Sequence, residues 1–128
     1  MIIGIGTDLV DIRRIDRLMQ RFGDRLIKKL LRPEEYADTS PLMPAFVAKR
    51  FAGKEAILKA LGTGLAGGMH WHDMVIVRNE RGKPTVILHN NAKALLDQLT
   101  PSGRNAAVDI SLTDEYPYAQ AFVVIAAF

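Results

Sequence analysis

An alternation of apolar and polar positions opens the chain. Ile3 and Ile5 point one way, and the residues between and after them, Gly4, Gly6 and Asp8, point the other. This period of two predicts a short β-strand over residues 2–7. The two glycines leave a shallow surface beside Asp8, where another backbone or a ligand can come close.

The spacing of apolar residues then changes from two to three or four. Apolar positions recur at helical intervals over residues 12–22, so a helix is expected there, with Asp8 or Asp11 as its N-cap. Gly23 ends or kinks this helix. A second short helix is expected over residues 26–31.

One long helix is predicted in the middle of the chain. Ser40 and Pro41 have the form of an N-cap followed by proline at the first helical position, and Pro44 is tolerated only in a first turn. The helix is therefore expected to be established by Ala45. It is expected to end at Gly62, where a glycine-rich loop begins.

The second half of the chain mixes strands with one helix. Strands are expected over residues 74–77, 85–88, 107–112 and 119–125. A turn sequence (RGKP) separates the first two strands, and Asn90 or Asn91 is expected to cap a helix that runs to Leu99. Short links of this kind favour a single α+β domain over residues 1–128, with a mainly antiparallel sheet packed with one long central helix.

Composition is ordinary for one soluble domain, with 48% apolar and 24% charged residues among 128. No apolar run approaches the ~18 residues of a membrane span. Asp8 and Asp11 interrupt the region in which a signal peptide stays apolar. The absence of cysteine excludes disulfides and thiolate chemistry. A cytoplasmic protein without a membrane partner is expected.

Positive charge is concentrated near the N-terminus. Eight basic and two acidic residues lie between Arg13 and Arg32, whereas the rest of the chain is net acidic. This asymmetry indicates an anionic partner, which composition leaves open among nucleic acid, membrane and an acidic protein. Arg13, Arg17 and Arg21 repeat every four residues, either as a docking surface or as a solvated helix face. No exposed aromatic residues are interleaved with them, as a nucleic-acid site would need.

A carboxylate falls among apolar residues of the central helix. At about 100° per residue, Glu55 shares its side of the helix with apolar neighbours. These neighbours are Ala48, Phe51, Ala52 and Leu58. Because a buried charge is costly unless it is paired or holds a metal, Glu55 indicates a functional site.

Asp8, Glu55 and Lys59 are the strongest candidates for chemistry. Two carboxylates with space beside them suit Mg²⁺, which keeps several waters and completes its coordination with substrate phosphates. Lys59 would offer a point charge to the same phosphate. The alternative is structural, because Glu55 and Lys59 have the i,i+4 spacing of a helical ion pair and Asp8 can serve as a helix cap.

The loop Gly62-Thr63-Gly64 directly follows these residues. It is a weak signal alone, because phosphate-binding loops usually precede a helix, where free N–H groups and the helix dipole favour anions. It either contributes to a phosphate site beside Lys59 or only ends the helix as a linker.

Three segments together resemble one protein family. They are residues 4–12 (GIGTDLVDI), residues 49–64 (KRFAGKEA, then KALGTG) and residues 82–84 (GKP). In order and spacing, over essentially the whole chain, they are similar to the motifs of the holo-[acyl-carrier-protein] synthases. These are the small stand-alone 4′-phosphopantetheinyl transferases of bacterial fatty-acid synthesis. The combination is highly specific, although each segment alone is not.

The resemblance implies a 4′-phosphopantetheinyl transferase-like fold and a reaction. Coenzyme A would give its 4′-phosphopantetheine group to a serine of apo acyl carrier protein and release adenosine 3′,5′-bisphosphate. Asp8 and Glu55 match the family's Mg²⁺ ligands, and Lys59 matches a catalytic lysine near the reacting phosphate. The general base stays unidentified. The family also implies a homotrimer with sites between subunits, and no nucleic acid.

Further positions are implied by the resemblance alone. Those matched to coenzyme A binding are Arg50, Lys54, Gly62, Thr63, Gly64 and Pro84. Those on the helix that docks the acidic carrier are Arg14, Arg17 and Arg21, of which Arg14 is the firm positional match.

The chain departs from the family near its end. Many members carry Ser-x-Ser-His or Ser-x-Thr-His there, whereas this chain has Leu112 in the histidine's place. That histidine therefore takes no part in the chemistry of this protein. Ser111, one residue earlier, is kept as a candidate substrate contact.

Two other functions fit part of the sequence. A binding module for nucleic acid or an acidic protein explains the arginines but not Glu55. A Mg²⁺-dependent nucleotide hydrolase would use the same carboxylates without a protein acceptor. Incubation with coenzyme A, Mg²⁺ and apo carrier separates the three, because only the transferase raises the mass of the carrier.

Overall fold

The computed structural model describes residues 1–128. Strands and α-helices alternate irregularly along the chain, with two short 3-10 helices, η1 and η2, between them. The elements in chain order are β1 (Ile2–Asp11), α1 (Ile12–Phe22), α2 (Asp24–Leu30), η1 (Pro33–Glu35), α3 (Pro44–Leu61), η2 (Trp71–Asp73), β2 (Met74–Arg78), β3 (Pro84–Leu88), α4 (Asn90–Leu99), β4 (Ala106–Glu115) and β5 (Tyr118–Ala127).

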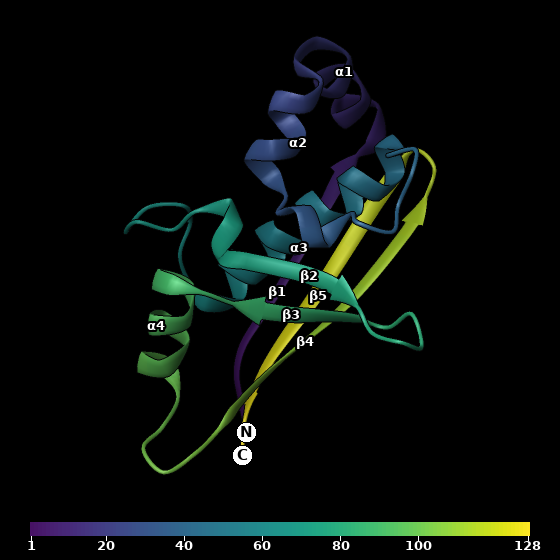
Figure 1. Ribbon diagram of the computed structural model, residues 1–128. Helices are drawn as coiled ribbons and strands as arrows, with labels where there is room; N and C mark the ends of the chain where they lie inside the picture. The colour runs from purple at the N-terminus through teal and green to yellow at the C-terminus, as the bar shows by residue number, and fades with distance from the viewer.

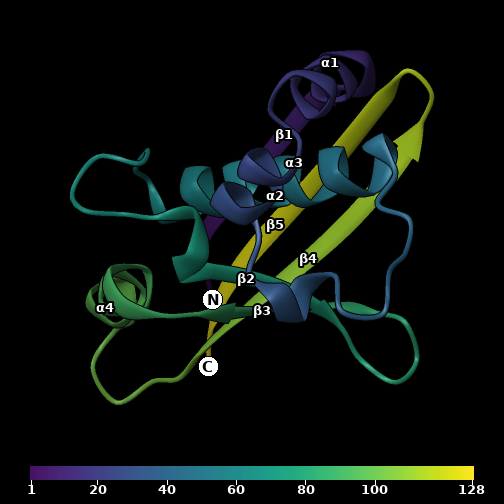
Figure 2. The same cartoon turned by 45° about the horizontal axis from the view of Figure 1, so that its top comes forward.

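All the strands pair antiparallel, in two sheets. β1, β5 and β4 form a three-stranded sheet in that order, and β2 and β3 form a separate hairpin. The hairpin crosses the long strands, and both chain ends lie close together at one end of the sheet (Figures 1 and 2). The predicted α+β class, with an antiparallel sheet and a long central helix, is confirmed.

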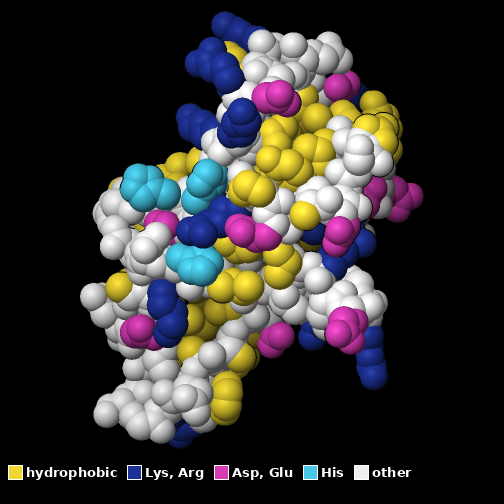
Figure 3. Space-filling view, in the orientation of Figure 1, with side chains coloured by type: hydrophobic (Ala, Val, Ile, Leu, Met, Phe, Trp, Pro, Cys, Tyr) yellow, Lys and Arg dark blue, Asp and Glu magenta, His cyan; other side chains and the backbone are white.

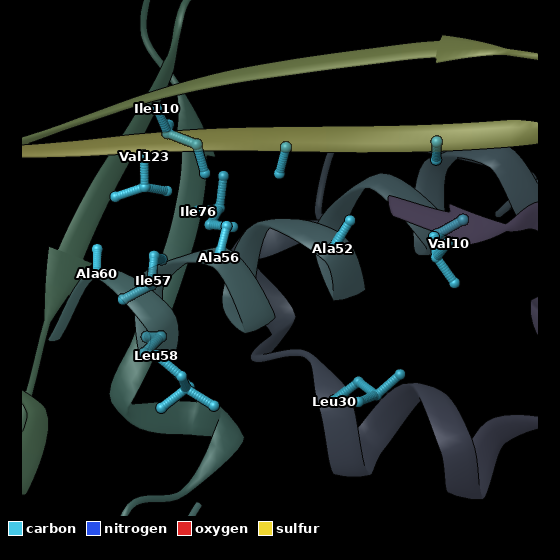
Figure 4. Packing of buried hydrophobic residues seen from close by; sticks show 14 of the residues in the cluster. Val10, Leu30, Ala52, Ala56, Ile57, Leu58, Ala60, Ile76, Ile110 and Val123 are labelled. Carbon is cyan, nitrogen blue, oxygen red and sulfur yellow. The ribbon is translucent and has the colours of Figure 1, made fainter. Parts of the chain in front are cut away.

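α3 is buried on nearly all sides. It packs against β1 and β5 on one side and against α1 and β2 on others. Figure 4 shows Ala52 and Ala56 on the side of α3 that faces the strands, with Leu30 of α2 beyond the opposite side. A helix surrounded in this way has no single apolar stripe.

The charges on α3 are therefore placed differently from the prediction. Arg50 and Lys54 are fully buried, whereas Glu55 is only half-buried. The sequence predicts Glu55 among apolar residues on one buried face, and the structure buries it only in part. Contacts with several neighbouring elements decide the burial instead.

Gly4 and Gly6 let β1 lie directly against α3. A Cβ atom at Gly6 would lie 2.0 Å from the carbonyl oxygen of Ala56, and one at Gly4 would lie 2.2 Å from that of Ala60. Only glycine leaves room for such a contact. The prediction that another backbone approaches here is confirmed, and Asp8 lies on the same face of β1.

Several element ends differ from the prediction. α3 begins at Pro44, so Pro41 lies before the helix and not at its first position. Pro44 takes that position because proline fits a helix only where no N–H is needed. α4 begins at Asn90, and its N-cap is His89 instead of either asparagine. The strands are longer than predicted because pairing with neighbours extends them.

The face of the three-stranded sheet that points away from α3 carries exposed apolar side chains among polar ones. In the strand register, Ile5 lies opposite Val124, and the next outward-facing residue of β5 is Phe122. Ile5 is 63% exposed, Leu9 61% and Phe122 47%. We call these four residues the outer sheet face. None of the helices combines the length and hydropathy needed to cross a bilayer.

Candidate active site

Asp8 and Lys59 meet where β1 packs on the last turn of α3. The Nζ atom of Lys59 donates to Oδ1 of Asp8 at 3.1 Å and to the carbonyl oxygen of Thr7 at 2.9 Å. The side chain of Lys59 is 54% exposed, so its ammonium group faces solvent beside Asp8. The structure thus brings together two candidates that are far apart in the sequence.

Glu55 completes this group from the preceding turn of α3. Burial, and then the negative charge of Asp8, raises the pKa of Glu55 above its ordinary value. Lys59 and Arg14 act in the opposite direction. Glu55 forms no ion pair within 4 Å, so the helical Glu55–Lys59 pair that the sequence left open is not formed.

These two carboxylates fit a hard divalent cation. The negative charge of Asp8 acts on Glu55, and a cation bound to both carboxylates would relieve that repulsion. No group of three or more His, Cys, Asp or Glu side chains comes together anywhere in the chain. Two carboxylates are compatible with Mg²⁺, which takes few protein ligands and completes its coordination with waters and phosphate oxygens.

Arg50 presents a second feature, a buried cation without partners. It is 1% exposed, and its Nε and Nη1 atoms have no hydrogen-bond partner. Its guanidinium carbon lies 4.5 Å from the centre of the Phe46 ring. Burial, reinforced by the nearby charge of Arg78, lowers the pKa of Arg50 to about 10. Arg50 and Arg78 line a cavity of about 560 Å³ beside the β2–β3 turn.

Lys54 is buried inside the fold and does not line this cavity. Its Nζ atom donates to the carbonyl oxygens of Leu30 at 2.6 Å and Trp71 at 3.0 Å, and to Oε2 of Glu35 at 2.9 Å. All three of its donors are therefore used within the protein. The sequence gives no signal for the role of Glu35, because its ion pair with Lys54 joins two segments that are distant in the sequence.

The remaining candidate contacts for coenzyme A are dispersed. Gly62 and Thr63 line a separate cavity of about 360 Å³ between the end of α3 and α4. Gly64 is exposed in the same loop. Pro84 is the first residue of β3 and therefore belongs to the β2–β3 hairpin, not to this loop. Ser111 lies opposite Phe122 in the strand register and is exposed. One chain therefore does not bring these residues to a single point.

Leu112 points to the other side of β4. It packs against the core, and a Cβ atom at Gly53 would lie 3.3 Å from its Cδ2 atom. Leu112 pairs with Ala121, which pairs in turn with Asp8. The position is therefore filled by an apolar side chain that packs on α3.

The arginines of α1 differ in whether an ion pair within the protein neutralises their charge. Arg13 pairs with Asp11 at 2.6 Å, and its hydrogen bond lowers the pKa of Asp11 to about 2. Arg14 lies over the ring of Phe51 with its guanidinium carbon 5.8 Å from the ring centre. Arg17 is exposed and forms no ion pair.

Arg21 lies over Phe22, 5.0 Å from the ring centre, and is also exposed. Basic side chains gather over α1 and α2 at the upper left of Figure 3. The predicted basic surface is thus present, and Arg13 is the member whose charge is neutralised locally.

Comparison with known proteins places this geometry in a family. The model of the 4′-phosphopantetheinyl transferase superfamily matches residues 4–121. A holo-[acyl-carrier-protein] synthase of Rhodopseudomonas palustris (strain HaA2) is 50% identical over 133 residues, which cover 99% of this chain and 94% of the relative. One of Agrobacterium fabrum is also 50% identical, with 99% and 96% covered.

Solved structures agree. Holo-[acyl-carrier-protein] synthase from Neisseria meningitidis has a TM-score of 0.83 at 37% identity and covers 98% of this chain and 99% of its own. The Helicobacter pylori enzyme, solved in complex with coenzyme A, has a TM-score of 0.81 at 27% identity, with 95% and 99% covered. The chain therefore belongs to the 4′-phosphopantetheinyl transferase superfamily, among the holo-[acyl-carrier-protein] synthases.

Proposed function

We propose that this enzyme transfers 4′-phosphopantetheine from coenzyme A to a serine of apo acyl carrier protein. The reaction depends on Mg²⁺, releases adenosine 3′,5′-bisphosphate and serves fatty-acid biosynthesis in the cytoplasm. The observation that carries the proposal is the convergence of Asp8, Glu55 and Lys59 from two elements. A Helicobacter pylori relative solved with coenzyme A supports the choice of donor.

Asp8 and Glu55 would hold the metal through their carboxylate oxygens. When bound, Mg²⁺ neutralises charge on the pyrophosphate of coenzyme A. The raised pKa of Glu55 supports this assignment, because burial and the negative charge of Asp8 both disfavour its ionised form and a bound cation would favour it.

Lys59 would act on the leaving group. The carrier serine oxygen would form a bond to the β-phosphorus of coenzyme A, the serine proton would pass to a water molecule, and the bond from that phosphorus to the bridging oxygen would break. Negative charge then develops on the 5′-phosphate of adenosine 3′,5′-bisphosphate. The solvent-facing ammonium group of Lys59, held beside Asp8, is placed to stabilise that charge. Catalysis of this kind rests on positioning and charge neutralisation.

Coenzyme A would be bound by residues of two neighbouring chains in a homotrimer. Arg50 and Pro84 belong to the hairpin side of the molecule, whereas Gly62, Thr63 and Gly64 belong to the far end of α3. The exposed apolar outer sheet face supports assembly, because patches of this kind usually mark an interface. Ser111 lies on that face and would contact the substrate of an adjacent site.

The carrier protein would dock on α1 through Arg14, Arg17 and Arg21. These side chains are exposed on a strongly basic surface, and opposite charges steer association. The charge of Arg14 lowers the pKa of Glu55, and this effect supports docking of the carrier near the proposed metal site.

A mass measurement tests the proposal. Apo acyl carrier protein is incubated with the enzyme, coenzyme A and Mg²⁺, and both proteins and nucleotides are analysed by mass spectrometry. The expected result is a carrier heavier by one phosphopantetheine, with one adenosine 3′,5′-bisphosphate released per carrier. Cleavage of coenzyme A without a change in the carrier would indicate a hydrolase instead, and no reaction would favour a binding module.

A further inference from the structure

Arg50 and Lys54 are two buried cations one turn apart on α3, and they have one buried carboxylate between them. Glu35 lies in direct contact with Lys54 and also exerts its charge on Arg50. Glu35 and Arg50 line the same cavity of about 560 Å³, whereas Lys54 does not. One carboxylate therefore has two cations available as partners, and the fold determines which of them it pairs with.

Glu35 is committed to Lys54. Its Oε2 atom accepts from Nζ of Lys54 at 2.9 Å and from the backbone N–H of Arg32 at 2.8 Å. Its Oε1 atom accepts from the backbone N–H of Ile76 at 2.9 Å. Both side chains are 0% exposed. These bonds fix the carboxylate at the junction of η1, α3 and β2, with no ion pair to Arg50.

Arg50 is left with unused donors as a consequence. Its Nε and Nη1 atoms are buried and unpartnered, and the Phe46 ring covers only a face of the guanidinium. Buried donors without partners are costly, and native proteins retain few of them. Arg50 lines the cavity together with Arg78 and with acidic residues of η1 and the β2–β3 turn, so its unused donors are the groups there that an anionic ligand would need.

We propose that Lys54 is a positioning residue that holds the Glu35 carboxylate and thereby keeps the Arg50 guanidinium free for an anionic group of coenzyme A. Lys54 itself does not touch the substrate. The inference rests on the proposed role of Arg50 in coenzyme A binding. It assigns to Lys54 an indirect action in place of the direct contact that family resemblance implies.

The two halves of the ion pair then have opposite effects on coenzyme A. In Lys54→Gln, the Glu35 carboxylate keeps its two backbone N–H bonds but loses its charged partner, so its charge acts on Arg50 and the Kd for coenzyme A rises about ten-fold or more. In Glu35→Gln the competing charge is gone, so the Kd stays within about three-fold of wild type. The double variant Glu35→Gln/Lys54→Gln behaves like Glu35→Gln. A purely structural pair would weaken binding in all three variants, in proportion to lost stability.

Isothermal titration calorimetry with coenzyme A and Mg²⁺ tests this, with thermal unfolding to confirm that each sample is folded. Lys93→Gln, on the exposed side of α4, is the control for loss of a lysine. In kinetics, Lys54→Gln should raise the KM for coenzyme A and leave the KM for the carrier unchanged. Equal losses of affinity in Glu35→Gln, Lys54→Gln and the double variant would overturn the inference.

The variant Arg50→Met tests the role of Arg50 in coenzyme A binding separately from the positioning role of Lys54. Weaker coenzyme A binding in Arg50→Met is expected, and unchanged binding would reject the role of Arg50 in the proposed function itself. If Lys54→Gln does not fold, the double variant decides. Affinity near that of wild type supports the inference, and a loss of about ten-fold or more overturns it.

Discussion

Lys59 donates a hydrogen bond to Asp8, 51 residues earlier in the chain, and not to Glu55, one turn earlier on its own helix. The local ion pair permitted by the spacing is replaced by a long-range one across the contact of α3 with β1. Glu55 is thereby left unpaired beside a second carboxylate. An unpaired, half-buried carboxylate costs stability. In the function proposed above, this carboxylate binds the metal ion together with Asp8.

Removal of either carboxylate should abolish activity without unfolding the protein. We expect Asp8→Asn and Glu55→Gln each to lower turnover by about 100-fold or more, because each loses a metal ligand and its charge. Both side chains are partly exposed, so the fold should persist. Kinetics with coenzyme A and carrier, together with circular dichroism, check this. Activity like that of wild type in either variant would reject the metal assignment.

The pH dependence of stability should reveal the repulsion at Glu55. Burial and Asp8 raise the pKa of Glu55, so the folded protein holds that proton more tightly than the unfolded chain. The free energy of unfolding therefore falls as pH rises from the ordinary to the raised pKa. Glu55→Gln should remove this fall and be at least as stable as wild type at neutral pH.

Urea unfolding in metal-free buffer, from acidic to neutral pH, measures this effect. Asp8→Asn serves as the comparison, because it should lower the pKa of Glu55 and shrink the same fall. A Glu55→Gln variant that is clearly less stable than wild type at neutral pH would contradict the expectation.

Gly6→Ala should destabilise the fold by forcing β1 away from α3. Its Cβ atom would lie 2.0 Å from a backbone oxygen that cannot move aside without shifting the helix. Overpacking of this kind costs about 1–3 kcal/mol. Gly64→Ala is a matched control for stability, because nothing lies within 4 Å of its added atom. Equal free energies of unfolding in the two variants would show that the contact is not tight.

Carrier docking should be sensitive to salt. Charges on α1 are exposed, and ions screen exposed charges over about 10 Å at 0.1 M salt. Added salt should therefore raise the KM for the carrier more than the KM for coenzyme A. Arg17→Ala should raise the carrier KM more than Arg13→Ala, because Asp11 already neutralises Arg13. Equal effects of salt on the two substrates would contradict docking on α1.

Assembly should depend on the outer sheet face. Phe122→Glu places a charge where a large apolar side chain is 47% exposed in the single chain. If this face is covered in a homotrimer, the variant should be monomeric by light scattering and should bind coenzyme A poorly. A variant that remains a trimer would show that the outer sheet face is not the interface, and a wild type that is an active monomer would show that the site is complete within one chain.

Local patterns in the sequence predict the elements of this fold well, because period and end signals act over a few residues. Asp11 caps α1 and Gly62 ends α3 as expected. The prediction that Pro41 is the first residue of the helix is wrong. Both Pro41 and Pro44 suit a first helical position, and the sequence does not show which of them the helix begins with.

The site is less predictable, because it depends on which elements meet. Asp8 and Lys59 meet through β1–α3 packing and not through a helical pair of Lys59 with Glu55, and the metal site that Asp8 would form with Glu55 stays a prediction. Neither the complete burial of Lys54 nor its pairing with Glu35 has a local signal. The Lys54–Glu35 pair is visible only in the folded structure, because the periodicity of a sequence does not show which segments lie close together.

Binding of Mn²⁺ as a substitute for Mg²⁺ tests the two-carboxylate site most directly. Electron paramagnetic resonance measures free Mn²⁺ in the presence of coenzyme A, for wild type, Asp8→Asn, Glu55→Gln and the control Asp24→Asn. We expect one Mn²⁺ per chain in wild type and the control, and affinity lower by about ten-fold or more in each of the other two variants. Unchanged Mn²⁺ affinity in Asp8→Asn or Glu55→Gln would contradict a metal held jointly by these side chains.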